Sequence, residues 1–203
     1  MAQRNDRPAR KADRIRLTGP AAIISLHDLS IRHRLLVSHI RAVITPACRN
    51  HPELKLLTWK EGRAIQDAVE IAVPIGYERV PVAADGFFSL GLQESRANYM
   101  VEADRGTSTV KRFTTKLQGF AAWHRQQRHK TKLGITSFRV LTVTSSDERL
   151  EHLVVSARQV CDVKDRGRMF LFTTEKELSL SKPDTMLNKI WTSVTEDEPC
   201  SIL

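Results

Sequence analysis

The chain changes its hydrophobic period directly after Asp104, and this change limits the folds that it can adopt. Residues 99–104 run or alternate apolar, as half-buried strands do. Residues 107–127 place apolar side chains at helical spacing instead, and residues 138–144 are again strand-like. A strand, a helix and a further strand in this order indicate an α/β fold.

The same analysis of spacing predicts elements along the rest of the chain. We predict a helix over 21–49 that is interrupted near His27 and Asp28, a strand at 54–59, a short helix or loop at 61–71, a strand that contains Asp85, a connection at 91–97, a helix at 147–160 and a strand at 169–173. The order predicts a mixed β-sheet flanked by helices, with an αβββαβ core followed by an extra helix and strand.

Composition divides the 203 residues into three parts. Residues 1–20 mix basic side chains, Asp and Pro with few apolar ones, which predicts a basic flexible arm. Residues 21–180 are long enough for one α/β core. Residues 181–203 form a C-terminal extension with an acidic tail, which we expect to pack loosely on the core.

The net charge of +9 and the isoelectric point near 9.8 favour a polyanionic partner, with DNA as the first candidate. The positive charge is concentrated near the start of the chain and again over 111–132, whereas a basic surface that serves solubility alone needs no such clusters. Three widely spaced cysteines predict a reducing, cytoplasmic setting, and no apolar run reaches membrane-spanning length.

Several chemistries lack their sequence signals. No glycine-rich phosphate loop and no nucleophile elbow is present, which argues against nucleotide hydrolysis and against a serine or cysteine nucleophile. His27, His33 and His39 are six residues apart and fall on different helix faces, so we expect no zinc site.

The strongest chemical signal is a set of acidic residues in strand-like segments. Glu102 and Asp104 share one face of their strand, and Asp85 lies on a predicted neighbour. Carboxylates in a partly buried position repel one another, and an oxygen-lined pocket of this kind suits a hard divalent cation, so we predict a metal site at Asp85, Glu102 and Asp104. The alternative is a solvated strand face that carries acids without a site.

Four short runs of residues carry a family resemblance. Asp85-Gly86-Phe87-Phe88 and Glu102-Ala103-Asp104-Arg105-Gly106-Thr107, together with Lys116-Leu117-Gln118-Gly119-Phe120 and Glu148-Arg149, resemble the replication-relaxation family of bacterial plasmids and mobile elements. The resemblance covers roughly residues 22–175. The order of elements is also similar to the restriction-endonuclease-like core of the PD-(D/E)xK nucleases.

The nuclease resemblance implies roles for particular residues. Asp85 and Glu102 would bind the metal, and Asp104 stands where the nuclease motif usually has lysine. Lysine supplies positive charge near the scissile phosphate, which aspartate cannot. Lys116 is a candidate substitute, or else an ordinary surface lysine whose stem packs along the core. The predicted catalytic residues are therefore Asp85, Glu102, Asp104 and Lys116.

Basic residues in and before the helix at 107–127, and just after it, are expected to contact DNA phosphates. The predicted nucleic-acid-binding residues are Arg105, Lys111, Arg112, Arg125, Arg128, Lys130 and Lys132. For Arg105, a structural ion pair with a nearby acid is the alternative. Two functions remain open: a Mg²⁺- or Mn²⁺-dependent DNA endonuclease or nickase in plasmid or mobile-element replication, and a catalytically inactive DNA-binding or partner-docking subunit, with protein partners in a mobile-element complex.

Overall fold

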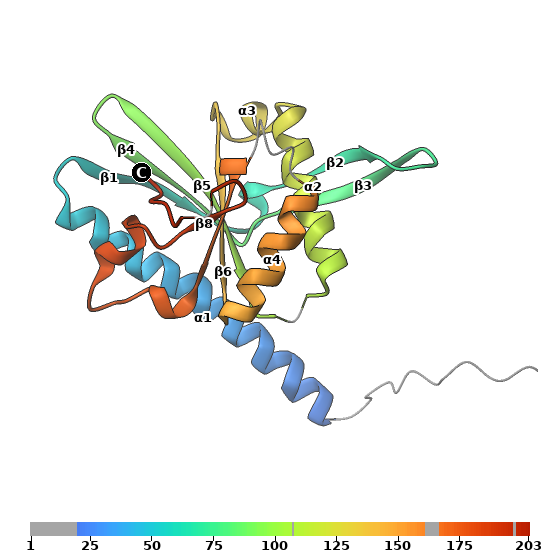
Figure 1. The fold of residues 1–203 in the computed structure, drawn as a ribbon, viewed down its shortest axis with the longest axis horizontal. Coiled ribbons are helices and arrows are strands. Elements are labelled where there is room, and N and C mark those ends of the chain that lie inside the picture. Colours follow the sequence, from blue (N-terminus) through green and yellow to red (C-terminus); the bar gives the residue numbers. More distant parts are fainter. Residues whose placement is uncertain (1–19, 107, 161–166, 197) are drawn as a thin grey trace, which may run out of the picture.

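A computed structural model describes residues 20–106, 108–160, 167–196 and 198–203 (Figure 1). The predicted basic arm over 1–20 lies, apart from Pro20, outside the described residues.

The centre of the protein is a six-stranded mixed sheet with the strand order β1-β4-β5-β6-β7-β8. Its strands are β1 (Leu54–Lys60), β4 (Gly86–Leu92), β5 (Ser95–Asp104), β6 (Arg139–Thr144), β7 (Phe170–Thr174) and β8 (Thr192–Ser193). The β1–β4, β4–β5 and β7–β8 pairs are antiparallel, whereas the β5–β6 and β6–β7 pairs are parallel. The predicted α/β class with a mixed sheet is confirmed.

Helices cover both faces of this sheet (Figure 1). Helix α1 (Pro20–Asn50) lies on one face, together with the 3₁₀ helix η4 (Pro183–Leu187). Helices α2 (Val110–Arg125) and α4 (Asp147–Val160) lie on the other, and the short helix α3 (Arg128–Leu133) follows α2. The Thr109 side chain caps α2 by accepting a hydrogen bond from the Arg112 backbone N–H at 3.2 Å.

The predicted interruption of the first helix near His27 and Asp28 is wrong, because α1 is continuous from Pro20 to Asn50. Asp28 is exposed and pairs with Arg32 one turn later at 3.1 Å, a spacing that supports a helix. Pro46 lies inside the last turns, where the buried side chains of Ile44 and Ala47 hold the helix on the core.

The prediction of a short helix or loop over 61–71 is also largely wrong. After the 3₁₀ turn η1 (Gly62–Ile65), residues Gln66–Ala72 form strand β2, which pairs with β3 (Tyr77–Ala83). The resulting two-stranded ribbon extends from the body of the molecule (Figure 1). Its inner face packs against α2, a long-range contact that gives this strand its stability.

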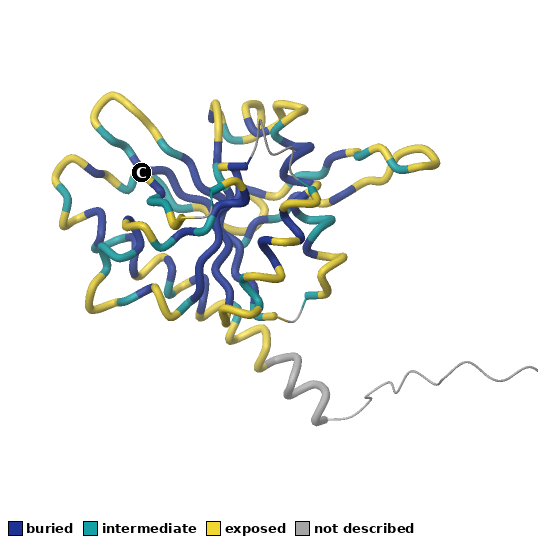
Figure 2. Tube along the Cα trace, viewed as in Figure 1, coloured by how far each residue is buried: buried dark blue, intermediate teal, exposed yellow. Residues whose placement is uncertain are grey.

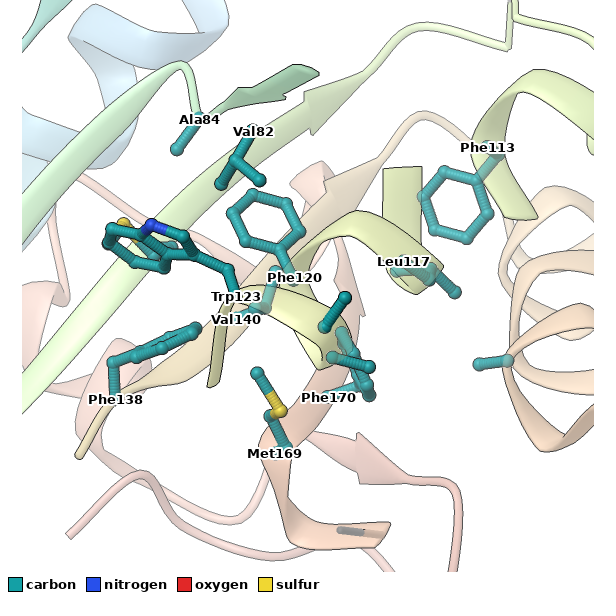
Figure 3. Packing of buried hydrophobic residues seen from close by; sticks show 14 of the residues in the cluster. Val82, Ala84, Phe113, Leu117, Phe120, Trp123, Phe138, Val140, Met169 and Phe170 are labelled. Carbon is teal, nitrogen blue, oxygen red and sulfur yellow. The ribbon is translucent and has the colours of Figure 1, made fainter. Parts of the chain in front are cut away.

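Alternating side chains of β4, β5, β6 and β7 belong to two hydrophobic clusters, one on each face of the sheet. On the α2 and α4 side, Met100, Phe120, Trp123 and Phe170 are fully buried, and Figure 3 shows part of this packing. Figure 2 shows that β4, β5, β6 and β7 are buried along most of their length.

The C-terminal extension packs tightly, contrary to the expectation of loose packing. Trp191 is completely buried, and its indole N–H donates to the Met186 carbonyl at 2.9 Å. The Tyr99 hydroxyl donates to the Ile202 carbonyl at 2.5 Å. The extension also supplies β8, so it completes the sheet edge and the α1-side cluster.

Candidate functional site

The acidic residues meet at one end of the β4–β5 pair. The sequence predicted that Asp85 lies inside a strand. This is wrong, because Asp85 lies in the connection between β3 and β4. Gly86 pairs with Val101, and the Asp85 backbone N–H donates to the Val101 carbonyl at 2.9 Å. Asp85 therefore lies beside the end of β5 that carries Glu102.

Both residues line a pocket of about 720 Å³. Its walls come from α1, from β3 of the ribbon, from the end of β5 and from the first half of α2. The same pocket is lined by Asp104 and by Lys116, so it brings together the four predicted catalytic residues.

Asp85 is held by two donors. The His33 Nε2 lies 3.1 Å from its Oδ1, and the Ala103 backbone N–H donates to its Oδ2 at 2.8 Å. Burial raises the pKa of Asp85, but the hydrogen bond from His33 and the charge of Lys116 outweigh burial and lower the pKa below its usual value. The hydrogen bond to Asp85 in turn raises the pKa of His33. Asp85 is therefore a carboxylate at neutral pH.

Glu102 forms an ion pair with Lys116, which reaches it from α2. Burial raises the pKa of Glu102 to about 8, although the Lys116 ammonium opposes this shift. Burial lowers the pKa of Lys116, but the charges of Glu102 and Asp85 outweigh it, so the pKa of Lys116 is raised. Lys116 therefore stays cationic at neutral pH.

One oxygen of Glu102 has no partner. Its Oε2 faces Lys116, whereas its Oε1 is buried without any hydrogen bond. A buried acceptor without a donor costs free energy.

Asp104 has different partners, although it lies only two residues from Glu102 on the same strand face. The Arg149 guanidinium from α4 donates to Oδ2 at 2.7 Å and to Oδ1 at 3.1 Å. The Thr144 hydroxyl and the Gly106 backbone N–H each donate to Oδ2 at 3.2 Å. Both oxygens of Asp104 are thus engaged.

The three predicted metal ligands differ in the hydrogen bonds that they already form. Across the described ranges, no group of three His, Cys, Asp or Glu side chains is placed to hold a metal ion. Asp85 and Glu102 line the same pocket, and Oε1 of Glu102 has no hydrogen-bond partner. Both oxygens of Asp104 are engaged by Arg149.

The predicted nucleic-acid-binding residues fall into two groups. Lys111 and Arg112 are exposed and line the pocket, as does Arg105, which pairs with Glu175 at 2.6 Å. The other group comprises Arg125, Arg128, Lys130 and Lys132, which are exposed at the far end of α2 and on α3. At 1.5 Å per residue, this second group begins about 14 Å along the helix from Lys116, the last residue of α2 that lines the pocket. Within it, Arg128 pairs with Asp67 at 2.6 Å.

Two residues at the site were not found from the sequence. His33 has no local signal, because only the packing of α1 brings it to Asp85. Arg149 belongs to the Glu148-Arg149 pair in the family resemblance, but the sequence gave no reason to connect it with Asp104, 45 residues away.

Comparisons with known proteins give one match. The family described as replication-relaxation matches residues 5–138, about two thirds of the chain, and the match ends directly before β6. Neither a curated protein nor a solved structure matches the chain. Within the part of the chain that the structure describes, no helix has the length and apolar character needed to cross a membrane.

Proposed function

Because this chain belongs to the replication-relaxation family, we propose that it acts on DNA during replication of a plasmid or other mobile element, as a metal-dependent endonuclease that nicks one strand. The proposal depends on Asp85, Glu102 and Lys116, which line a single pocket.

The order of the strands supports a nuclease-like core. Strands β1, β4 and β5 form an antiparallel meander, α2 follows, and β6 returns parallel to β5. This order resembles the αβββαβ core of the PD-(D/E)xK nucleases, with the β2–β3 ribbon as an insertion. Asp85 precedes the second strand of the meander and Glu102 lies on the third, which is compatible with the nuclease pattern.

The observation that carries the proposal is the ion pair between Lys116 and Glu102. The strand motif has Asp104 where nucleases of this type usually have lysine. Lys116 reaches the Glu102 carboxylate from α2, and its side chain, which lines the pocket, is 30% exposed. Helix α2 thus supplies the positive charge that the strand motif lacks. The Lys116 ammonium would stabilise negative charge that develops on a phosphate.

The other residues have supporting roles. Asp85 and Glu102 would hold the metal, and His33 orients the Asp85 carboxylate. Mg²⁺ or Mn²⁺ at this pair would supply the Lewis acidity that activates water and polarises the phosphodiester. Lys111 and Arg112, exposed at the rim, would bind neighbouring phosphates and hold the strand over the pocket.

A supercoiled-plasmid nicking assay with Mg²⁺ or Mn²⁺ tests the proposal. We expect Asp85→Asn, Glu102→Gln and Lys116→Met each to lower the nicking rate by about 10²-fold or more. Lys189→Met removes an exposed lysine outside the pocket and is the matched control for Lys116→Met. Nicking that survives in all three pocket variants would refute the proposal.

One observation favours a second candidate, a DNA-binding or partner-docking subunit without catalysis. The strand motif lacks its lysine, and Arg149 engages both oxygens of Asp104. This candidate predicts DNA binding that weakens steeply with salt and no nicking with either metal.

A further inference from the structure

The connection between β5 and α2 is the element that sets the distance between Glu102 and Lys116. Glu102 lies near the end of β5, and Lys116 lies six residues into α2, about 9 Å along the helix from its first residue. Successive residues of a helix are rotated by about 100°, so a start displaced by one residue would turn Lys116 away from the strand.

Arg149 contacts this connection at both of its ends. Its guanidinium binds Asp104, the last residue of β5, through two hydrogen bonds. The same guanidinium donates to the Ser108 carbonyl at 2.8 Å, immediately before the capping residue Thr109. One side chain from α4 therefore spans the connection.

The contacts are shielded from water. The side chain of Asp104 is 7% exposed and that of Arg149 is 14% exposed. Thr144 on β6 and the Gly106 backbone N–H add further donors to the same carboxylate. A bidentate arginine–carboxylate pair has a defined orientation, which a single-point contact does not provide.

We propose that Asp104 and Arg149 are positioning residues: they hold the start of α2 against the end of β5, so that the Lys116 ammonium reaches Glu102. Asp104 then acts through the helix rather than on the metal. The inference rests on the proposed function for its consequence in catalysis, but the placement of Lys116 can be measured without any nicking.

The test replaces both partners together. Asp104→Leu/Arg149→Met removes the two charges at once, and apolar replacement of a buried pair often leaves stability unchanged. Lys176→Ala is the matched control, since Lys176 pairs with Asp147 on the same helix α4 but is largely exposed. Arg149→Lys is a second variant that keeps the charge and loses the two-point contact.

Two readouts are compared in folded protein. The first is acylation of Lys116 by acetic anhydride, measured by peptide mass spectrometry with exposed Lys111 as internal reference. We expect a severalfold increase in the double variant, a smaller increase in Arg149→Lys and none in the control. The second is nicking, which should fall by about 10²-fold in the double variant, because displacement of a catalytic group by about 1 Å has such an effect.

Unchanged Lys116 acylation in folded Arg149→Lys and in the double variant would overturn the inference, whatever happens to nicking. If the double variant does not fold, Arg149→Lys alone decides. If the parent does not nick DNA but Lys116 acylation rises as expected, the positioning role stands and the proposed function fails.

Discussion

Glu102 and Asp104 are two acids on one face of one strand, yet their surroundings differ in almost every respect. Glu102 faces a pocket, shares one oxygen with Lys116 and leaves the other without a partner. Asp104 receives hydrogen bonds from Arg149, Thr144 and Gly106 on its two oxygens. Glu102 therefore keeps one oxygen without a hydrogen-bond partner, whereas both oxygens of Asp104 accept hydrogen bonds from within the fold.

Two acids that share a strand face therefore need not have the same role. Whether a carboxylate oxygen is free to bind a ligand depends on the donors that other elements place beside it. These donors come from α2 for Glu102 and from α4 and β6 for Asp104. An unsatisfied buried oxygen is costly, and a bound ligand would relieve that cost.

Among variants that alter the surroundings of the two acids, Arg149→Met should cause the largest loss of stability. The change leaves Asp104 buried without its cation, so we expect the free energy of unfolding at pH 7 to fall by about 3–5 kcal/mol. Lys116→Met should cost less, because Glu102 can take up a proton at its pKa of about 8. Urea denaturation of both variants measures this, and equal losses would show that the two acids depend on their cations alike.

The next effect is the pH dependence of stability. The folded protein binds the Glu102 proton more tightly than the unfolded chain does, because burial raises the pKa to about 8. The resulting stabilisation is complete below the ordinary pKa of glutamic acid and is lost as the pH rises through 8. Between pH 5.5 and 8 the parent should therefore lose roughly 3 kcal/mol more than Glu102→Gln.

Urea denaturation at these two pH values gives the difference. His33 titrates in the parent and the variant alike, so its contribution largely cancels. Identical pH profiles for parent and Glu102→Gln would mean that Glu102 is ionised throughout this range and that the pocket is wetter than its burial indicates.

A third effect separates the two acids by metal binding. MnCl₂ at about 100 times its Kd should raise the free energy of unfolding of the parent by about 2.7 kcal/mol, since it binds the folded state alone. Thermal unfolding should show this stabilisation in Asp104→Asn but not in Glu102→Gln. Loss of the stabilisation in Asp104→Asn as well would place Asp104 among the ligands.

The smallest effect should come from Arg105→Ala, at the residue directly after Asp104. Its ion pair with Glu175 is partly exposed, with 21% and 35% of the two side chains accessible. Such pairs contribute about 1 kcal/mol or less to stability, well below the buried pair of Arg149. Urea denaturation beside Arg149→Met checks this, and a loss above about 2 kcal/mol would show that Arg105 also anchors the connection.

Much of the core could be predicted from local patterns, whereas the ribbon could not. The alternation in 99–104 and the helical spacing after it correspond to β5 and α2. Strand β2 was missed because its inner face is covered by α2, which follows almost 40 residues later in the chain. A marginal hairpin of this kind is stabilised by that packing rather than by its own sequence.

In the candidate site, too, some residues could be predicted from the sequence and others could not. Glu102 and Asp104 were placed on one face by the two-residue period of a strand, and Lys116 was a candidate only through a family resemblance. His33 was not a candidate, since nothing near it in the chain distinguishes it from the other histidines on α1.

Local patterns in the sequence were sufficient to predict the order of most strands and helices and the shared face of Glu102 and Asp104, because these depend on neighbours within a few residues. The hydrogen bonds of the two acids depend on the folded structure instead. Glu102 keeps an oxygen without a partner and Asp104 does not, because α2 reaches the first acid and α4 and β6 reach the second. Contacts between distant segments arise from packing, which no local period encodes.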